Sequence, residues 1–292
     1  MNIKIINFLK YDHRTRLTLF SIAVFWVIFL LVFFSQYFRP YLLKVSFYNV
    51  GQGDGIFIET PERYQVLVDG GPGAKILEEI ARDMPFYDRT IDLLIPTHPD
   101  SDHIAGLVDI LERYKVKTIL LPKIKSNTIV YKRLLNDIQK EGAILKEAVR
   151  TESVQKIELP GEVSFEILNP IKDEPYKSDN DSSMVTLFRY GNIEFLLLAD
   201  VTSKKEKETL PLLPKGIEVV KIAHHGSKYS SDPEFLRSIS PKLCVIEVGE
   251  NKYGHPSKEA LSAMQSSGCK IWRTDRDGTL TVYSDGERYW IQ

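Results

Sequence analysis

The segment 98–103, with the sequence His-Pro-Asp-Ser-Asp-His, places four candidate metal ligands within six residues. The apolar run 91–97 before it is typical of a buried strand, and residues 104–111 after it have helical spacing. A loop between a strand and a helix can direct all four side chains into the crevice where α/β folds place chemistry. Gathering such groups away from water is costly unless a divalent cation compensates their charge. The segment therefore predicts an α/β fold with a metal centre. The alternative is a loop that only caps its helix.

The histidine distribution supports the metal centre. The chain has six histidines, five of them in three short motifs: His13, His98, His103, His224, His225 and His255. Imidazole is the commonest metal-ligand side chain and the usual proton carrier at neutral pH. The pair at 224–225 ends an apolar strand, and adjacent residues of an extended chain point to opposite sides. We therefore expect one of the two to bind metal and the other to support the ligands or the reaction.

Three acidic residues and one further histidine each have two possible roles, one chemical and one structural. Asp200 ends the apolar strand 193–199 and is either a carboxylate that bridges two metals or part of a helix start; beside the other motifs we favour the bridge. His255, just before a helix, either contacts a phosphate or leaving group or caps the loop. For Asp54 and Asp69, which lie next to glycines, we favour supporting or turn roles.

Residues 17–38 carry no charge and are long enough to span a bilayer. A buried core helix is rarely apolar all round over such a length, and the end of the stretch has no small-x-small cleavage site for a signal peptide. We predict an uncleaved signal anchor. More basic residues flank the span on its N-terminal side than on its C-terminal side. Lys4, Lys10, Arg14 and Arg16 precede it, and Arg39 and Lys44 follow it. The positive-inside rule then leaves residues 1–16 in the cytoplasm, with a single pass at 17–38 and everything from about residue 42 onward outside the cell membrane.

The net charge and the cysteine content restrict the class of protein in two ways. The net charge of −1 and the pI of about 6.6 give no global basic field for nucleic acid, although a metal pair can itself receive a phosphate. Two cysteines, Cys244 and Cys269, are too few for a disulfide framework. We interpret them as buried small hydrophobic residues. A single disulfide between them is the alternative if the domain lies outside the cytoplasm.

Residues 44–292 read as one domain. Strands come early in hairpins and then alternate with helices, which predicts mixed sheets covered by helices. We expect helices at 76–83, 104–111, 131–140, 233–239 and 258–267.

Together these motifs resemble the metallo-β-lactamase fold superfamily, whose signature is His-x-His-x-Asp-His followed by a later His, a bridging Asp and a final His. Here Asp100 replaces the second histidine, a variant similar to one branch, the hydrolase domain of the ComEC competence DNA-uptake channels. That branch's other motifs are similar in order over roughly residues 44–285: 50–54, 68–71, 180–183, 223–227, 253–257 and 274–278.

The resemblance implies an α/β fold, an αββα metallo-β-lactamase sandwich preceded here by one transmembrane helix, with two divalent metal ions, zinc or manganese. His98 and Asp100 would hold one ion. Asp102, His103 and one histidine of the pair, with His224 favoured, would hold the other, and Asp200 would lie between them. The superfamily's middle histidine is replaced by the segment 180–183, so one site is poorer in protein ligands. The polytopic channel is absent, which makes DNA transport by this chain itself an unfavoured interpretation.

The leading hypothesis is a membrane-anchored metal-dependent hydrolase, a phosphodiesterase or nuclease that attacks DNA with a metal-activated water. The expected catalytic residues are Asp102, His225 and His255, and the expected substrate contacts are Asn180, Ser183, Ser227 and Lys228. One alternative is a hydrolase of a lactone, lactam or other small ester, since fold does not decide substrate. Another is a non-catalytic partner of a separate DNA-uptake channel.

Overall fold

The computed structural model describes residues 12–37, 42–176 and 178–292, in two compact units, Met1–Tyr41 and Leu42–Gln292. The first unit contains α1 (His13–Tyr37). Between residues 17 and 31 its apolar side chains are exposed, among them Phe20 (65% exposed) and Phe25 (64%). The stretch His13–Leu31 is long and apolar enough to cross a membrane. Lys4, Lys10, Phe38 and Arg39, on which the predicted span and its orientation also depend, lie outside the described residues.

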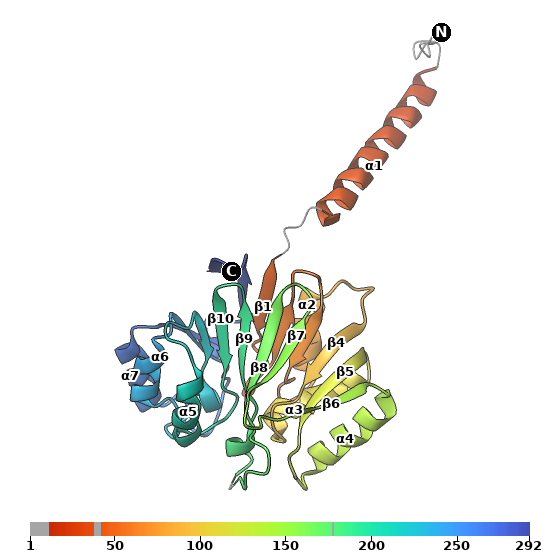
Figure 1. The fold of residues 1–292 in the computed structure, drawn as a ribbon. Helices are drawn as coiled ribbons and strands as arrows, with labels where there is room; N and C mark the ends of the chain where they lie inside the picture. The colour runs from red at the N-terminus through yellow and green to blue at the C-terminus, as the bar shows by residue number, and fades with distance from the viewer. Residues whose placement is uncertain (1–11, 38–41, 177) are drawn as a thin grey trace. The chain divides into compact units, whose positions relative to one another are not determined.

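The second unit is a sandwich of two sheets between two layers of helices (Figure 1). The eight-stranded sheet has the order β15-β14-β1-β2-β3-β4-β5-β6. Its strands are β1 (Leu43–Phe47), β2 (Ile56–Glu59), β3 (Gln65–Val68), β4 (Thr90–Ile95), β5 (Lys115–Pro122), β6 (Ile144–Ala148), β14 (Leu280–Ser284) and β15 (Tyr289–Ile291). The seven-stranded sheet has the order β13-β12-β11-β10-β9-β8-β7. Its strands are β7 (Gln155–Leu159), β8 (Val163–Asn169), β9 (Val185–Tyr190), β10 (Ile193–Leu197), β11 (Val219–Lys221), β12 (Leu243–Ile246) and β13 (Lys270–Arg273).

Three apolar clusters hold these layers together. Phe47, Phe165 and Phe195 belong to the cluster between the sheets. The helices on the outer face of the eight-stranded sheet are α2 (Lys75–Asp83), α3 (Ser101–Leu111) and α4 (Ile129–Glu141), and those of the other sheet are α5 (Ser203–Thr209), α6 (Pro233–Ile239) and α7 (Lys258–Ser267). A four-residue helix, α8 (Thr274–Asp277), precedes β14. The αββα sandwich that the resemblance implied is therefore confirmed.

Two edges of this sandwich matter for function. Strands β3 to β6 are parallel to one another, as are β10 to β13, and we call the edge where they end the carboxyl edge. The opposite edge, where they begin, is the amino edge. Because β1 is antiparallel to β2 and β2 to β3, β1 runs in the direction of β3 and begins at the amino edge. The chain therefore enters the domain at the edge opposite to the strand ends.

The two cysteines form a disulfide, Cys244–Cys269, with a Cα–Cα distance of 5.9 Å. Both side chains are buried as expected, and the single disulfide that the sequence left open is formed. The bond joins β12 to the start of β13 and closes a loop over a separation of 25 residues.

Removing this disulfide should cost about 3 kcal/mol of unfolding free energy, because a loop of that length gains entropy when the unfolded chain is released. Urea unfolding of Cys244→Ala/Cys269→Ala, compared with the oxidised and the reduced wild-type chain, measures the effect. The variant should match the reduced wild type. Equal stability of all three would contradict the prediction.

Candidate metal centre

The motif 98–103 joins β4 to α3 at the carboxyl edge. Asp100 is the N-cap residue of α3, so Asp102 and His103 lie in its first turn rather than before the helix, as the spacing of residues 104–111 had suggested. The start of α3 packs tightly on the loop after β3: a Cβ on Gly106 would lie 2.0 Å from the carbonyl oxygen of Gly70. Only glycine permits this approach. The His103 side chain, one turn earlier in α3, is fully buried.

The second part of the centre comes from the neighbouring sheet. Asp200 follows β10 and is buried, and the pair His224–His225 follows β11. The pair is not extended, so that part of the prediction is wrong: both residues have positive φ, 50° and 52°. The carbonyl oxygen of Ala199 accepts the His224 N–H at 2.9 Å, which joins this tight turn to the residue before Asp200. Left-handed strain of this kind is kept where the surrounding structure requires it.

Asp200 is the hub of the assembled cluster. Its carboxylate oxygens lie 3.3–3.9 Å from four Nε2 atoms, those of His103 (3.3 Å), His225 (3.6 Å), His224 (3.8 Å) and His98 (3.9 Å). Two half-exposed acids complete the open side: Asp100 is 3.6 Å from His98 Nε2, and Asp102 is 3.4 Å from His225 Nε2. All six predicted metal-ligand residues are thus brought together, with His225 in addition.

The Nδ1 atoms of three of these histidines have polar partners on the side away from Asp200. Nδ1 of His103 is 2.8 Å from Asp69 Oδ2, Nδ1 of His225 is 2.8 Å from the carbonyl oxygen of Glu247, and Nδ1 of His98 is 3.0 Å from Thr97 Oγ1.

Asp54 also lies on this side, 3.3 Å from His225 Nδ1 and 3.6 Å from His103 Nδ1. Two triplets, Asp54–His103–His225 and Asp69–His98–His103, offer ligand atoms within 4.8 Å of one another. Because their Nδ1 atoms already have partners, the geometry instead directs the three Nε2 atoms toward Asp200. Partners of this kind fix the orientation of metal-binding histidines.

The orphaned atoms fit a metal centre. Among the described residues, Nε2 of His98, His103 and His225 and Oδ1 of Asp200 are buried without a hydrogen-bond partner. Buried polar atoms are costly in this state, and four of them in one cluster fit the donor set of a cation. Two ligands of one zinc ion, at bond lengths of about 2.1 Å and a tetrahedral angle, are separated by about 3.4 Å. The His103–Asp200 separation of 3.3 Å is close to that value, and the separations of His225 (3.6 Å) and His98 (3.9 Å) from Asp200 are somewhat longer.

The electrostatics point the same way. Burial opposes charge on His225, yet Asp200, Asp102 and Asp54 outweigh it and raise its pKa to about 10. Burial likewise opposes charge on His103, and Asp200, Asp54 and Asp69 outweigh it and raise its pKa well above its usual value. Asp200 keeps a pKa well below its usual value, because these imidazoles outweigh its burial. The acids therefore attract positive charge into the cluster, as protons or as metal ions.

Two charged residues of the centre were not singled out in the sequence. Lys221, fully buried at the end of β11, donates to Asp54 Oδ2 and, at 3.3 Å, to the carbonyl oxygen of Ala199. Glu247, also fully buried, accepts the Gly55 N–H at 3.0 Å. The available signal was a charged residue inside an apolar strand run, in Val-Val-Lys-Ile-Ala and Val-Ile-Glu-Val.

The predicted substrate-contacting residues divide into two groups. Asn180 Nδ2 lies 3.2 Å from His224 Nδ1, and the His224 and His255 rings are 5.3 Å apart, so these three share the rim of the cluster. Burial and then His224 lower the pKa of His255 to about 4, so its ring is neutral at neutral pH.

Lys228 is exposed, with its ammonium 5.1 Å from the Tyr229 ring centroid. Ser183 and Ser227 are buried, and the Ser227 hydroxyl accepts the Tyr229 N–H at 3.3 Å within its own turn. The structure therefore does not present these two hydroxyls on the rim.

Comparison with known proteins agrees with this geometry. The sequence pattern of the metallo-beta-lactamase superfamily matches residues 48–245. ComE operon protein 3 of Bacillus subtilis (strain 168) is 30% identical over 256 residues, 81% of this chain and 32% of that protein. Competence protein ComA of Neisseria gonorrhoeae is 28% identical over 264 residues, 87% of this chain and 35% of that protein. The chain spans about a third of the length of these relatives.

A solved structure shows the same fold. Tm1679, a metal-dependent hydrolase of the beta-lactamase superfamily, aligns with a TM-score of 0.54 at 13% identity, over 82% of this chain and 98% of that one. The predicted resemblance to this superfamily and to competence proteins is confirmed. With its sequence pattern, its sandwich and its cluster of histidines and carboxylates, this chain belongs to the metallo-beta-lactamase superfamily and carries the fold of its metal-dependent hydrolases.

Proposed function

We propose that this chain is a membrane-anchored phosphodiesterase that cleaves DNA with two divalent metal ions. The observation that carries the proposal is the convergence of unpartnered Nε2 atoms from His98, His103 and His225 on the buried carboxylate of Asp200. Three carboxylates beside imidazoles make a site that suits manganese as well as zinc.

His98 and Asp100 would hold one ion, Asp102, His103 and His225 the other, and Asp200 both. We favour His225 over His224 here, because its Nε2 is fully buried and faces both Asp102 and Asp200. Divalent ions held there would lower the pKa of water to near neutrality and offset the charge of a phosphoryl group.

The chain's own residues would bind and orient the phosphodiester. His224, His255 and Asn180 share the rim, where ring and amide N–H groups can donate to phosphate oxygens. A neutral His255 donates a hydrogen bond without carrying charge at neutral pH. Lys228 supplies an exposed ammonium near the same turn, suited to the next phosphate of a polynucleotide.

The names of the relatives bear on the substrate class. The two relatives named above are a competence protein and a ComE operon protein. These names favour DNA over a lactone or lactam as the substrate. A domain outside the cytoplasm also suits the Cys244–Cys269 disulfide, because disulfides persist in oxidising compartments.

Turnover of matched substrates tests the proposal. The purified metal-loaded chain should cleave a single-stranded oligonucleotide and a model phosphodiester faster than a lactone or a β-lactam. His98→Ala/Asp102→Ala should abolish cleavage, while Asp109→Asn, a half-buried carboxylate on α3, should not. Undiminished cleavage by the double variant, or preference for the lactone, would refute the proposal. A folded wild-type chain with near-zero metal content would favour the non-catalytic partner instead.

The two adjacent histidines should differ in their effect on metal binding. His225→Ala should lower metal affinity by more than about a hundredfold, because a buried ring facing two carboxylates is lost. His224→Ala should lower turnover but retain most of the metal. Chelator competition followed by elemental analysis measures both, and equal metal loss in the two variants would contradict the assignment.

A further inference from the structure

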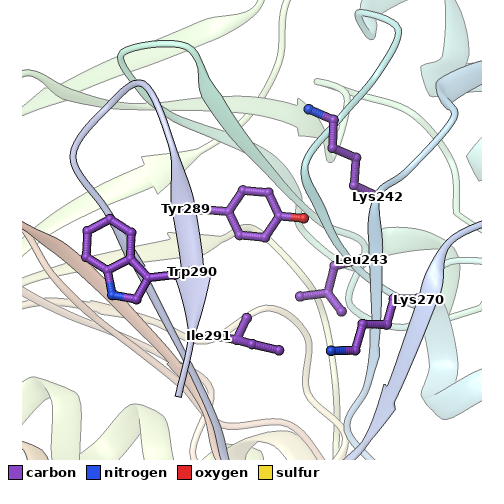
Figure 2. A pocket seen from close by; sticks show the side chains of 6 residues that line it. All are labelled: Lys242, Leu243, Lys270, Tyr289, Trp290 and Ile291. Carbon is purple, nitrogen blue, oxygen red and sulfur yellow. The ribbon is translucent and has the colours of Figure 1, made fainter.

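A second concave site lies far from the metal cluster in the fold. It has a volume of about 440 Å³ and is lined by Lys242, Leu243, Lys270, Tyr289, Trp290 and Ile291. Figure 2 shows Tyr289 and Ile291 pointing from β15 toward Leu243 and the two lysines, with Trp290 on the other face of the strand. The pocket thus combines two ammonium groups, a phenol and an aliphatic floor.

One of the two ammonium groups lacks an acidic partner. Lys242 Nζ contacts Glu218 Oε1 at 2.8 Å, whereas Lys270 has no carboxylate within 4 Å among the described residues. The Lys270 N–H donates to the carbonyl oxygen of Lys242 at 2.9 Å, so their backbones are neighbours, and Figure 2 shows their ammonium groups toward opposite ends of the pocket. Such a pair in a pocket suits an anionic group attached to an apolar one.

This pocket lies at the amino edge. Leu243 and Lys270 are the first residues of β12 and β13. Tyr289 pairs with Ser284, which pairs with Leu43, the first residue of β1. The pocket therefore opens at the edge where the chain enters the domain, five residues after α1 ends in the sequence.

Exposed aromatic side chains mark the same edge. Phe86 and Tyr87 are 87% and 68% exposed, in the loop that leads into β4. The neighbouring Asp88 accepts a hydrogen bond at 2.8 Å from Gln65, the first residue of β3. Trp290 on β15 is 43% exposed. β4 and β15 are five strand positions apart, so the two aromatic sites are separated by about 24 Å along the edge.

We infer that the amino edge docks on an anionic lipid bilayer, with a phospholipid headgroup in the Lys242–Lys270 pocket and Phe86, Tyr87 and Trp290 in the interfacial layer. Aromatic rings prefer this layer, and lysines bind its anionic headgroups. The inference rests on the proposed membrane anchoring. It assigns the pocket a ligand separate from the substrate of the metal centre.

Vesicle flotation of the domain 42–292, which contains all three apolar clusters, tests the inference. The domain should float with vesicles containing phosphatidylglycerol, and less with pure phosphatidylcholine or in high salt. Lys242→Gln/Lys270→Gln should bind the anionic vesicles about thirtyfold more weakly. Phe86→Ser/Tyr87→Ser should also weaken binding.

Matched controls separate this site from general charge and hydrophobicity. Lys123→Gln/Lys125→Gln changes two exposed lysines after β5 at the carboxyl edge, and Ile129→Ser changes a side chain that is 86% exposed on α4. Both should float like wild type. Equal flotation of the Lys242/Lys270 variant, equal loss in the controls, or binding of an oligonucleotide but not of vesicles would overturn the inference. All variants should keep wild-type metal content and phosphodiester turnover, so failure of the hydrolase proposal would be seen independently.

Discussion

The Asp200→Asn variant is expected to lose most of its bound metal and about a thousandfold in kcat/KM, the equivalent of about 4 kcal/mol. Asparagine keeps the shape of the side chain but removes the charge and one acceptor oxygen. Asp200 is the residue whose oxygens approach four imidazole Nε2 atoms, at 3.3–3.9 Å. Both ions of the proposed pair would therefore lose a ligand at once. Elemental analysis after gel filtration and turnover of a model phosphodiester measure the two losses.

Two comparisons make this result specific to the cluster. Asp109→Asn, on α3 but outside the metal centre, should retain metal and activity. Circular dichroism should show that Asp200→Asn is folded, because the substitution is nearly isosteric. A folded Asp200→Asn chain with full metal content would show that the ions are bound elsewhere or that Asp200 is not a shared ligand.

The Lys221→Met variant is expected to lose about 3–5 kcal/mol of unfolding free energy in the metal-free chain. Lys221 is fully buried, and its ammonium is the partner of the equally buried Asp54. Burial raises the pKa of Asp54, but Lys221 and the histidines outweigh that effect and lower it to about 2, so the carboxylate stays charged. Methionine fills the space of the lysine stem but leaves this charge uncompensated. Urea unfolding in the presence of a chelator measures the loss.

A second substitution separates charge from packing. Lys221→Met/Asp54→Asn removes both charges and should recover at least half of the lost stability, because the uncompensated carboxylate is gone. Lys115→Met, which removes an ion pair whose lysine side chain is 64% exposed, should change stability by no more than about 1 kcal/mol. A Lys221→Met chain as stable as Lys115→Met would contradict the prediction.

The sequence predicted the parts of this molecule whose signal is local. Ligands in 98–103 follow an apolar run, and β4 and α3 form on either side of them. The five expected helices are all present, within two or three residues of the predicted limits. Asp200 and the histidine pair were placed at strand ends for the same reason, since a run of apolar residues that stops at a polar one marks the end of a buried strand.

Features that depend on contacts between residues distant in sequence could not be predicted from local patterns. β6 and β7 are edge strands, with four of five residues exposed in β6 and two of five in β7, so their sequences lack the apolar run of a central strand. The left-handed turn at His224 and His225 is set by packing against residue 199 rather than by local preference. The pairing of Lys221 with Asp54 joins residues 167 positions apart.

Because the metal cluster and the lysine pocket lie at opposite edges of the sandwich, the cluster is held at a distance from any surface that the amino edge contacts. If the amino edge rests on lipid, the metal cluster stands about one strand length, about 20 Å, above the headgroups. A polymer lying flat against the bilayer is then out of reach, whereas a strand that rises away from the surface meets the cluster end-on. The sandwich would thus act as a spacer that selects substrates by their approach, before any chemistry distinguishes one phosphodiester from another.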